Sequence, residues 1–325
     1  MRSLRSMSRQ RITRRQFMGA SSVVASAAVL SLSGCSAGAN DIYTWGAGTK
    51  VSSWYPIAAT LKTQLSELDL RLQTTGGVSN AALVGQERID FGFSQDFTLV
   101  MAQKGEGPFT QSFDNLRVMF TFLLGYAQYV VRADSGIKRV QDLAGHRVNM
   151  VSRQFSTELA NEIILKAAGI FDQVDKAYLG YADGAQEFTD GQLDALLYPV
   201  IAPNASIQNA ARVVSIRLLD FDEALIAKVS ELNPALRAGT LREGIYSGVN
   251  KPVQTLVTRH VAFTRADMDE DIVYQIVRVA FENKRRIEKA HVALRQMSLA
   301  AMSGPIAGLT FHPGARRYFK EAGLR

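Results

Sequence analysis

Hydroxyl, amide and backbone N–H groups are concentrated in one short stretch, residues 75–80 (Thr-Gly-Gly-Val-Ser-Asn). Gly76 and Gly77 let the backbone turn where a Cβ would clash, and Ser79 or Asn80 is predicted to cap the helix that follows. A glycine turn and a helix start direct several N–H groups at one point, where the helix dipole favours negative charge. This chemistry suits a carboxylate. The alternative is a plain helix cap after a tight turn, without a ligand.

Two further turns must position similar groups. Residues 46–53 join a strand at 41–45 to a helix with Pro56 in its first turn, and residues 94–96 join an apolar strand to a helix opened by Asp96. Alternating strands and helices predict a parallel or mixed sheet in which ligands sit beyond the carboxyl ends of the strands. All three turns would then lie at one edge of the sheet.

A second set of strands and helices follows. The apolar runs 116–124 and 128–132 predict two strands interrupted at Gly125, where the chain crosses into a second domain, and Pro199 is expected to end a later strand. The last part of the chain is expected to return to the first domain near Gly248. Two lobes joined by two crossings would place the ligand site in a cleft between them.

Other functional patterns are incomplete. The glycine-rich segment 46–50 lacks the spacing of a phosphate loop, and segment 92–96 has Asp where a nucleophile elbow has its last Gly. The histidines show no paired spacing for zinc, since they stand at positions 146, 260, 291 and 312. We therefore expect no cofactor, no metal and no catalysis.

Composition bounds the partners. The chain has 325 residues, 47% of them apolar and 21% charged, as in a globular protein large enough for two domains. The net charge of +7 comes from the first 34 residues, which contain six arginines and no acidic residue. Subtracting these six from 37 basic residues leaves 31 against 30 acidic ones. A basic patch for nucleic acid is therefore not supported.

The first 35 residues have an export pattern. A basic region with Arg14, Arg15 and Phe17 precedes an apolar small-residue stretch at 19–32 and a Leu-Ser-Gly-Cys run that ends at Cys35. The segment resembles a twin-arginine signal ending in a lipobox, which implies export by that route and a lipid on Cys35. A transmembrane anchor is the alternative, but the apolar stretch is short for it. Cys35 is the only cysteine, so disulfides within the chain are excluded.

Several motifs occur in a fixed order along the chain: Trp54-Tyr55-Pro56, the run 75–80, residues 89–96 (Ile-Asp-Phe-Gly-Phe-Ser-Gln-Asp), residues 142–148, residues 190–195, residues 311–315 (Phe-His-Pro-Gly-Ala) and residues 318–323. Together they resemble the TAXI family of solute-binding receptors of TRAP transporters. The resemblance covers nearly all of the chain after residue 40. It implies an α/β, two-lobed periplasmic-binding-protein fold of type II that closes on a small solute.

The export pattern and the two crossings near Gly125 and Gly248 predict a division of the chain. Residues 1–35 form the signal, with Cys35 as the mature N-terminus, residues 36–125 and 249–325 form lobe I, and residues 126–248 form lobe II. The family's ligand positions correspond here to the aromatic pair, the run 75–80, the segment 94–96 and a threonine in lobe II. With their neighbours, the expected ligand-binding residues are Thr49, Lys50, Trp54, Tyr55, Thr75, Gly77, Ser79, Asn80, Ser94, Gln95, Asp96, Arg153, Ser156, Thr157 and Tyr198.

The chain departs from the family at the expected cleft edge. Val51-Ser52 stands in place of a glycine pair, and Gln154-Phe155-Ser156-Thr157 stands in place of Gly-Ser-Gly-Thr. Phe155 would reshape the pocket. Lys50 and Arg153 add cations that could pair with an anionic solute, although a lone surface cation more often points to solvent.

The sequence therefore predicts a lipid-anchored, periplasmic or cell-surface receptor. It would capture a small organic anion of the carboxylate, amino-acid or keto-acid type and deliver it to the membrane subunits of a TRAP-type secondary transporter. The alternative is a sensing module of the same fold that presents its solute-bound form to a membrane kinase or regulator. An enzyme is not expected, because no nucleophile and base are paired.

Overall fold

The computed structural model describes residues 42–48, 50, 52–153, 155–289 and 292–324. The predicted signal, with Arg14, Arg15 and Cys35, lies outside the described residues, as does Thr49. Among the described helices, none combines the length and the apolar character needed to cross a membrane.

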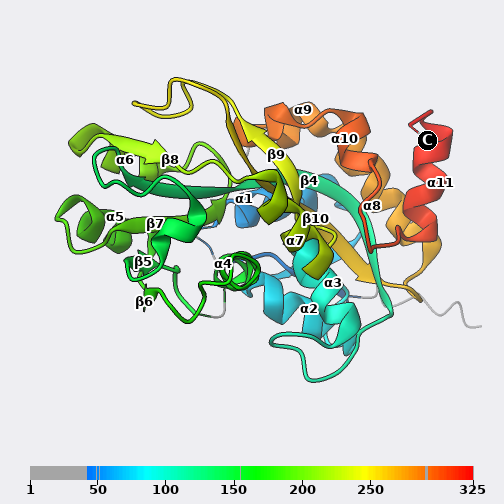
Figure 1. The fold of residues 1–325 in the computed structure, drawn as a ribbon. Coiled ribbons are helices and arrows are strands. Elements are labelled where there is room, and N and C mark those ends of the chain that lie inside the picture. The colour runs from blue at the N-terminus through cyan, green and yellow to red at the C-terminus, as the bar shows by residue number, and fades with distance from the viewer. Residues whose placement is uncertain (1–41, 49, 51, 154, 290–291, 325) are drawn as a thin grey trace, which may run out of the picture. The chain divides into compact units, whose positions relative to one another are not determined.

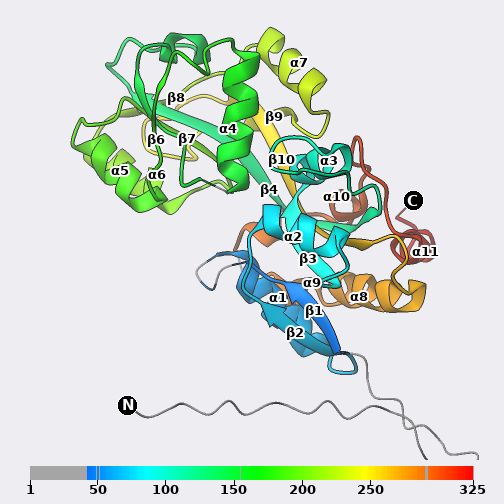
Figure 2. The ribbon, with the colours of Figure 1, turned by 90° about the horizontal axis from the view of Figure 1, so that it is seen from below.

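Among the described residues, ten strands form one mixed sheet. Its order is β2-β1-β3-β10-β4-β7-β5-β6, with β8 paired to β4 and β9 paired to β10. Figure 1 labels β4 to β10, and Figure 2 labels β1 to β3. Neighbours among β1, β2 and β3 and among β5, β6 and β7 are parallel, whereas β10 and β4 are antiparallel to their partners. The strands are β1 (Ile42–Gly46), β2 (Asp69–Gln73), β3 (Phe91–Gln95), β4 (Leu116–Arg132), β5 (Arg147–Asn149), β6 (Asp175–Ala177), β7 (Ala195–Val200), β8 (Ile216–Leu218), β9 (Arg237–Leu241) and β10 (Val253–Arg265).

Helices connect the parallel strands, as the alternation of the sequence predicts. The helices of the described residues are α1 (Trp54–Gln64), α2 (Gly77–Gly85), α3 (Asp96–Lys104), α4 (Ser156–Ala167), α5 (Tyr181–Thr189), α6 (Ala205–Val213), α7 (Glu223–Leu232), α8 (Glu270–Glu282), α9 (Lys284–Ile287), α10 (Leu299–Ser303) and α11 (Pro313–Glu321), of which α1, α2, α4 and α5 connect parallel strands. Two 3₁₀ helices, η1 (Val140–Leu143) and η2 (Val292–Gln296), complete the set.

Strands β4 and β10 run between two groups of elements, which Figure 2 shows on either side of them. The first part of β4 pairs with β10 and its last part pairs with β7 and β8. The predicted interruption at Gly125 is wrong, because β4 continues through it. Gly125 lies opposite Thr258 of β10, and a Cβ on Gly125 would lie 2.7 Å from the Thr258 Oγ1 atom. The glycine therefore serves close packing within a strand and not a break.

Pro199 does not end its strand either, since β7 extends to Val200. Pro199 pairs with Ala127 of β4 on one side, whereas the pairing of β7 with β5 is confined to Ala195 and Leu196. A residue without an N–H group is tolerated where one side of the strand has no ladder to complete. The strand can therefore pass through the proline.

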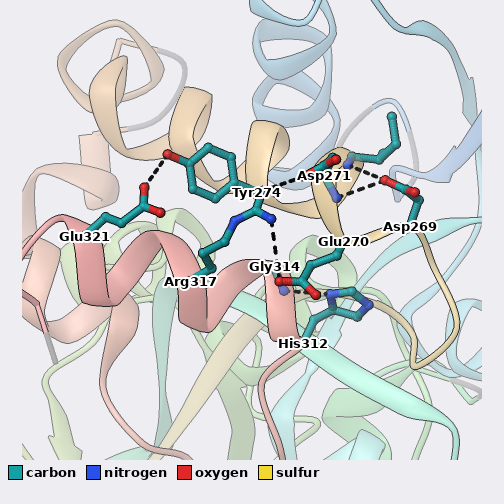
Figure 3. Close-up of polar contacts among 9 residues, drawn as sticks. Asp269, Glu270, Asp271, Tyr274, His312, Gly314, Arg317 and Glu321 are labelled. Atoms are coloured by element: carbon teal, nitrogen blue, oxygen red, sulfur yellow. Dashed lines mark hydrogen bonds and ion pairs between the residues drawn. The ribbon is translucent and has the colours of Figure 1, made fainter.

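The Phe-His-Pro-Gly-Ala motif builds the junction between α11 and α8. The His312 Nδ1 atom accepts a hydrogen bond from the Gly314 N–H group at 3.2 Å and so caps α11, with Pro313 in the first turn (Figure 3). A Cβ on Gly314 would overlap the Glu270 carbonyl oxygen and lie 2.9 Å from the Tyr274 backbone nitrogen. Only glycine lets the two helices approach this closely, so the motif has a packing role.

Arg317 of α11 completes this junction at the surface. Its guanidinium lies 2.7 Å from the Asp271 carboxylate and 3.6 Å from the Glu270 carboxylate, and it stacks over the Tyr274 ring at 4.3 Å (Figure 3). The Tyr274 hydroxyl donates to the Glu321 carboxylate at 2.6 Å. Exposed ion pairs of this kind contribute little individually, about 0–1 kcal/mol each, so apolar packing carries most of the stability of the junction.

Candidate functional site

Residues from four segments of the chain converge at the start of α2. A Cβ placed on Gly77 would lie 3.1 Å from the Ser156 Oγ atom, 3.1 Å from the Trp54 Cη2 atom and 3.2 Å from the Ser94 Oγ atom. Ser156 begins α4, and Ser94 lies at the carboxyl end of β3, just before α3. We call these four residues, Trp54, Gly77, Ser94 and Ser156, the Gly77 site.

The helices that begin at the Gly77 site have no side-chain cap. Their N-caps are Gly76 for α2, Gln95 for α3 and Phe155 for α4, and none of these side chains accepts a hydrogen bond from its helix. Elsewhere side chains do cap helices α6, α7, α8, α10 and α11, through Asn204, Asp222, Asp269, Ser298 and His312. Three helix starts whose N-cap side chains accept no hydrogen bond therefore meet where the helix dipoles favour negative charge, and in α3 the carboxylate of Asp96 already takes one of the free N–H groups.

Asn80 holds α2 over the sheet. The predicted capping role of Ser79 or Asn80 is wrong, because the helix already begins at Gly77. The Asn80 side chain is fully buried, and its Nδ2 atom donates to the carbonyl oxygens of Gly46 at 3.1 Å and Phe93 at 2.8 Å. These carbonyls lie near the carboxyl ends of β1 and β3, which are neighbours in the sheet. Asn80 therefore fixes the start of α2 at that edge.

Asn161 repeats this arrangement in α4. Its buried Nδ2 atom donates to the carbonyl oxygens of Met150 at 3.3 Å and Leu197 at 2.8 Å. Met150 follows β5, and Leu197 lies in the neighbouring strand β7. Two of the helices at the Gly77 site, α2 and α4, are thus each pinned by an asparagine that bridges two strands. The sequence signal for Asn161 is a polar residue on the apolar face of a helix.

Thr75 supports Asn80, whose Oδ1 atom accepts a hydrogen bond from the Thr75 hydroxyl. The Ser94 hydroxyl donates to the Gly77 carbonyl oxygen at 3.0 Å. Ser156 differs from both, because its buried Oγ atom has no hydrogen-bond partner among the described residues. A buried hydroxyl is usually paired, so Ser156 retains the capacity to bind a group that enters the site.

Trp54 contacts a residue that the sequence patterns did not indicate. Its Nε1–H group donates to the His260 Nδ1 atom at 2.8 Å, and the two rings pack edge to face at 5.5 Å. The His260 Nε2 atom lies 3.5 Å from the Nε2 atom of the Gln95 amide. His260 stands alone in an otherwise strand-like run, so nothing in its sequence context associates it with Trp54.

The hydroxyl groups of Thr157, Tyr181 and Tyr198 lie close together near the start of α4. The Thr157 and Tyr181 hydroxyls are 2.8 Å apart, and the Tyr198 hydroxyl donates to the Tyr181 carbonyl oxygen at 3.0 Å. The Tyr198 hydroxyl also accepts from the Asn149 Nδ2 atom at 3.1 Å. Burial raises the pKa of Tyr181 to about 12 and raises the pKa of Tyr198 further. Both phenols are therefore neutral at physiological pH.

The remaining expected ligand residues occupy different environments. Tyr55 is half-buried and packs on the core, whereas Lys50 and Ser79 are exposed. Arg153 is also exposed, and its guanidinium lies over the Tyr178 ring at 4.1 Å. The structure brings none of these four into the Gly77 site, and their ligand roles stay predictions.

Asp96 begins α3 and is fully buried. Its Oδ1 atom accepts a hydrogen bond from the Phe97 N–H group at 2.9 Å. Burial raises the pKa of the Asp96 carboxyl from 3.8 to about 7, although backbone hydrogen bonds from Arg259 and Phe97 and the charge of Arg259 oppose the rise. The ionised form is therefore costly inside the folded protein.

The free energy of unfolding is expected to fall as the pH rises from about 4 to about 7. A raised pKa means that the carboxyl stabilises the fold fully below about 4, and that this contribution is lost as the pH rises through about 7. Between about pH 5 and pH 8 the loss amounts to about 3 kcal/mol. In urea unfolding at pH 5 and at pH 8, Asp96→Asn should show a much smaller change in the free energy of unfolding than the wild-type protein. The exposed control Asp114→Asn should keep the wild-type change. An unchanged slope in Asp96→Asn would contradict the assignment.

The sequence matches the NMT1-like family over residues 45–323, which is most of the chain and includes every residue of the Gly77 site. The chain belongs to the NMT1-like family. In this NMT1-like protein, the described residues contain no group of three or more His, Cys, Asp or Glu side chains placed to hold a metal ion.

Two solved structures with TM-scores above 0.5 share the fold of this NMT1-like protein. The XAC2383 protein of Xanthomonas citri, solved with ATP, is 12% identical over 87% of this chain and 96% of that protein, with a TM-score of 0.53. Its chloride-bound structure gives 11% identity over 87% and 97%, with a TM-score of 0.52. The periplasmic aliphatic sulphonate binding protein SsuA of Escherichia coli is 17% identical over 79% and 78%, with a TM-score of 0.47. The predicted class, a two-lobed α/β fold of the type II periplasmic-binding kind, is confirmed.

Proposed function

We propose that this NMT1-like protein is an extracytoplasmic solute receptor that binds a small organic anion at the Gly77 site. One observation carries the proposal: the starts of α2, α3 and α4 meet without side-chain caps around the buried hydroxyl of Ser156. Helix N–H groups and hydroxyls would replace the water around a carboxylate, and burial would strengthen each polar contact. The other expected ligand residues would surround this centre.

Closure would create the complete site. Gly77 comes from the proposed lobe I (residues 36–125 and 249–325), and Ser156 comes from the proposed lobe II (residues 126–248). Because the two residues are in contact, a solute can reach this point only when the lobes separate. Strands β4 and β10 connect the lobes and would carry the hinge motion.

Binding can be tested directly with the mature protein. We expect at least one member of a panel of small carboxylates, including amino acids and 2-oxo acids, to raise the melting temperature, and calorimetry should then give a single site per chain. Uncharged amides of the same acids serve as matched controls and should not bind. A panel without any binder, or equal binding of acid and amide, would argue against an anion receptor.

The motifs of the first lobe and the C-terminal region support delivery to a TRAP-type transporter. A twin-arginine signal would direct export of the receptor, and a lipid on Cys35 would keep it at the membrane. Uptake of the bound solute by cells that carry the receptor and its transporter should stop when sodium is replaced by choline. Uptake that continues without sodium would contradict this type of carrier.

Replacement of both arginines of the signal by lysine, Arg14→Lys together with Arg15→Lys, should leave the protein in the cytoplasm.

A further inference from the structure

The orientation of the Trp54 indole depends on a residue outside the Gly77 site. The Cη2 atom, on the six-membered ring of the indole, forms part of that site. The Nε1–H group, on the five-membered ring, donates to His260. Indole nitrogen can only donate a hydrogen bond, so the His260 Nδ1 atom must be the acceptor and carries no proton. In neutral imidazole the proton then resides on Nε2, so the Gln95 amide must turn its oxygen towards it, and this Oε1 atom has no other hydrogen-bond partner among the described residues.

The position of His260 is itself closely determined. The side chain is 6% exposed and packs edge to face against Phe122 at 6.2 Å. A Cβ on Gly125 would lie 3.0 Å from the His260 Nε2 atom, so only a glycine on β4 leaves room for the ring. The register between β10 and β4 shifts directly after His260. His260 therefore acts as a rigid acceptor on a strand that connects the two halves of the fold.

We propose that His260 is a positioning residue for solute binding: its neutral imidazole holds the Trp54 indole against the Gly77 site, and protonation of His260 weakens binding. The inference rests on the proposed receptor function. Protonation would turn Nδ1 from an acceptor into a donor that faces the indole N–H group. The hydrogen bond would be lost, and the indole would no longer be held at its edge of the site.

Other ionisable groups occur on the elements around His260. They include Tyr55 on α1, Asp96 on α3, Tyr126 and Tyr129 on β4, Arg237 on β9 and Arg259 on β10 itself, while Lys62, Lys104, Arg117, Arg132 and Arg265 lie elsewhere on the same elements. The Arg259 guanidinium donates to the Pro305 carbonyl oxygen. Asp96 titrates in the same pH range as an ordinary histidine, so its contribution must be separated by experiment.

The test uses the carboxylate that gives the largest thermal shift in the panel, with dissociation constants measured between pH 5.5 and 8. We expect the wild-type protein to bind about tenfold more weakly at pH 5.5 than at pH 8, which corresponds to about 1.4 kcal/mol. His260→Asn keeps an acceptor near the Nδ1 position but does not titrate, so it should bind within about threefold of wild type at pH 8 and show no such loss. His260→Phe should bind about tenfold more weakly at both pH values.

Two controls separate the possible causes. Asp96→Asn should retain the pH dependence of binding if His260 is the responsible group. Trp45→Phe leaves Trp54 as the single tryptophan, and its fluorescence should titrate over the same pH range without any ligand, an effect that His260→Asn abolishes. A binder whose affinity in His260→Asn keeps the wild-type pH dependence would overturn this inference alone. A panel without a binder would overturn the receptor function and this inference together.

Discussion

Gly77→Val is expected to weaken binding of the panel carboxylate by about 100-fold or more. The new side chain would occupy the space bounded by the Ser156 hydroxyl, the Trp54 ring and the Ser94 hydroxyl, all within 3.2 Å of the Cβ position. It would also cover the first N–H groups of α2 and keep α4 at a distance. Overpacking of this kind costs about 1–3 kcal/mol, and lost contacts to the anion add to it.

The neighbouring glycine supplies the matched control. Gly76 has an extended backbone, with φ −108° and ψ 163°, and no atom lies within 4 Å of the position of a Cβ there. Gly76→Val should therefore bind within about threefold of wild type, apart from a small cost of the changed N-cap. Calorimetry on both variants, with melting temperatures to confirm folding, makes the comparison. Unimpaired binding by Gly77→Val would remove the Gly77 site from the mechanism.

Asn80→Asp should destabilise the protein by about 4 kcal/mol near pH 7.5, because it buries a charge and removes two donors at once. The carbonyl oxygens of Gly46 and Phe93 would face a carboxylate in place of an amide. The volume of the side chain is unchanged, so packing cannot explain a loss. Urea unfolding followed by circular dichroism measures the difference in the free energy of unfolding.

Ser79→Asp is the control for the added charge. Ser79 is exposed in the first turn of the same helix, where the dipole favours an acidic group. The Ser79→Asp variant should therefore be as stable as the wild-type protein or slightly more stable. Burial would raise the pKa of the new carboxyl at position 80, and the deficit of Asn80→Asp should therefore shrink as the pH is lowered towards about 4. Equal stability of the two variants would show that Asn80 does not hold α2.

The motifs that carry the family resemblance have two different roles in the structure. The turn at 75–80 and the segment 94–96 do lie at one edge of the sheet, as their positions after strands predict. The Phe-His-Pro-Gly-Ala motif instead builds a helix junction, because Gly314 permits contact between the backbones of α11 and α8. A match to a family motif therefore does not tell whether its residues form a ligand site or a packing site. Only the neighbours of each residue in the structure show this.

Local pattern by itself determined the class of the fold, the approximate place of most helices and strands and the common edge of the turns, because each depends on hydrophobic period and on glycine and proline over a few residues. The tertiary structure alone decided which helix starts meet, and it reversed the interpretation of Gly125 and Pro199. It also paired Trp54 with His260 across 206 residues. Such contacts depend on how strands order themselves in the sheet, and a short window of sequence does not encode that order.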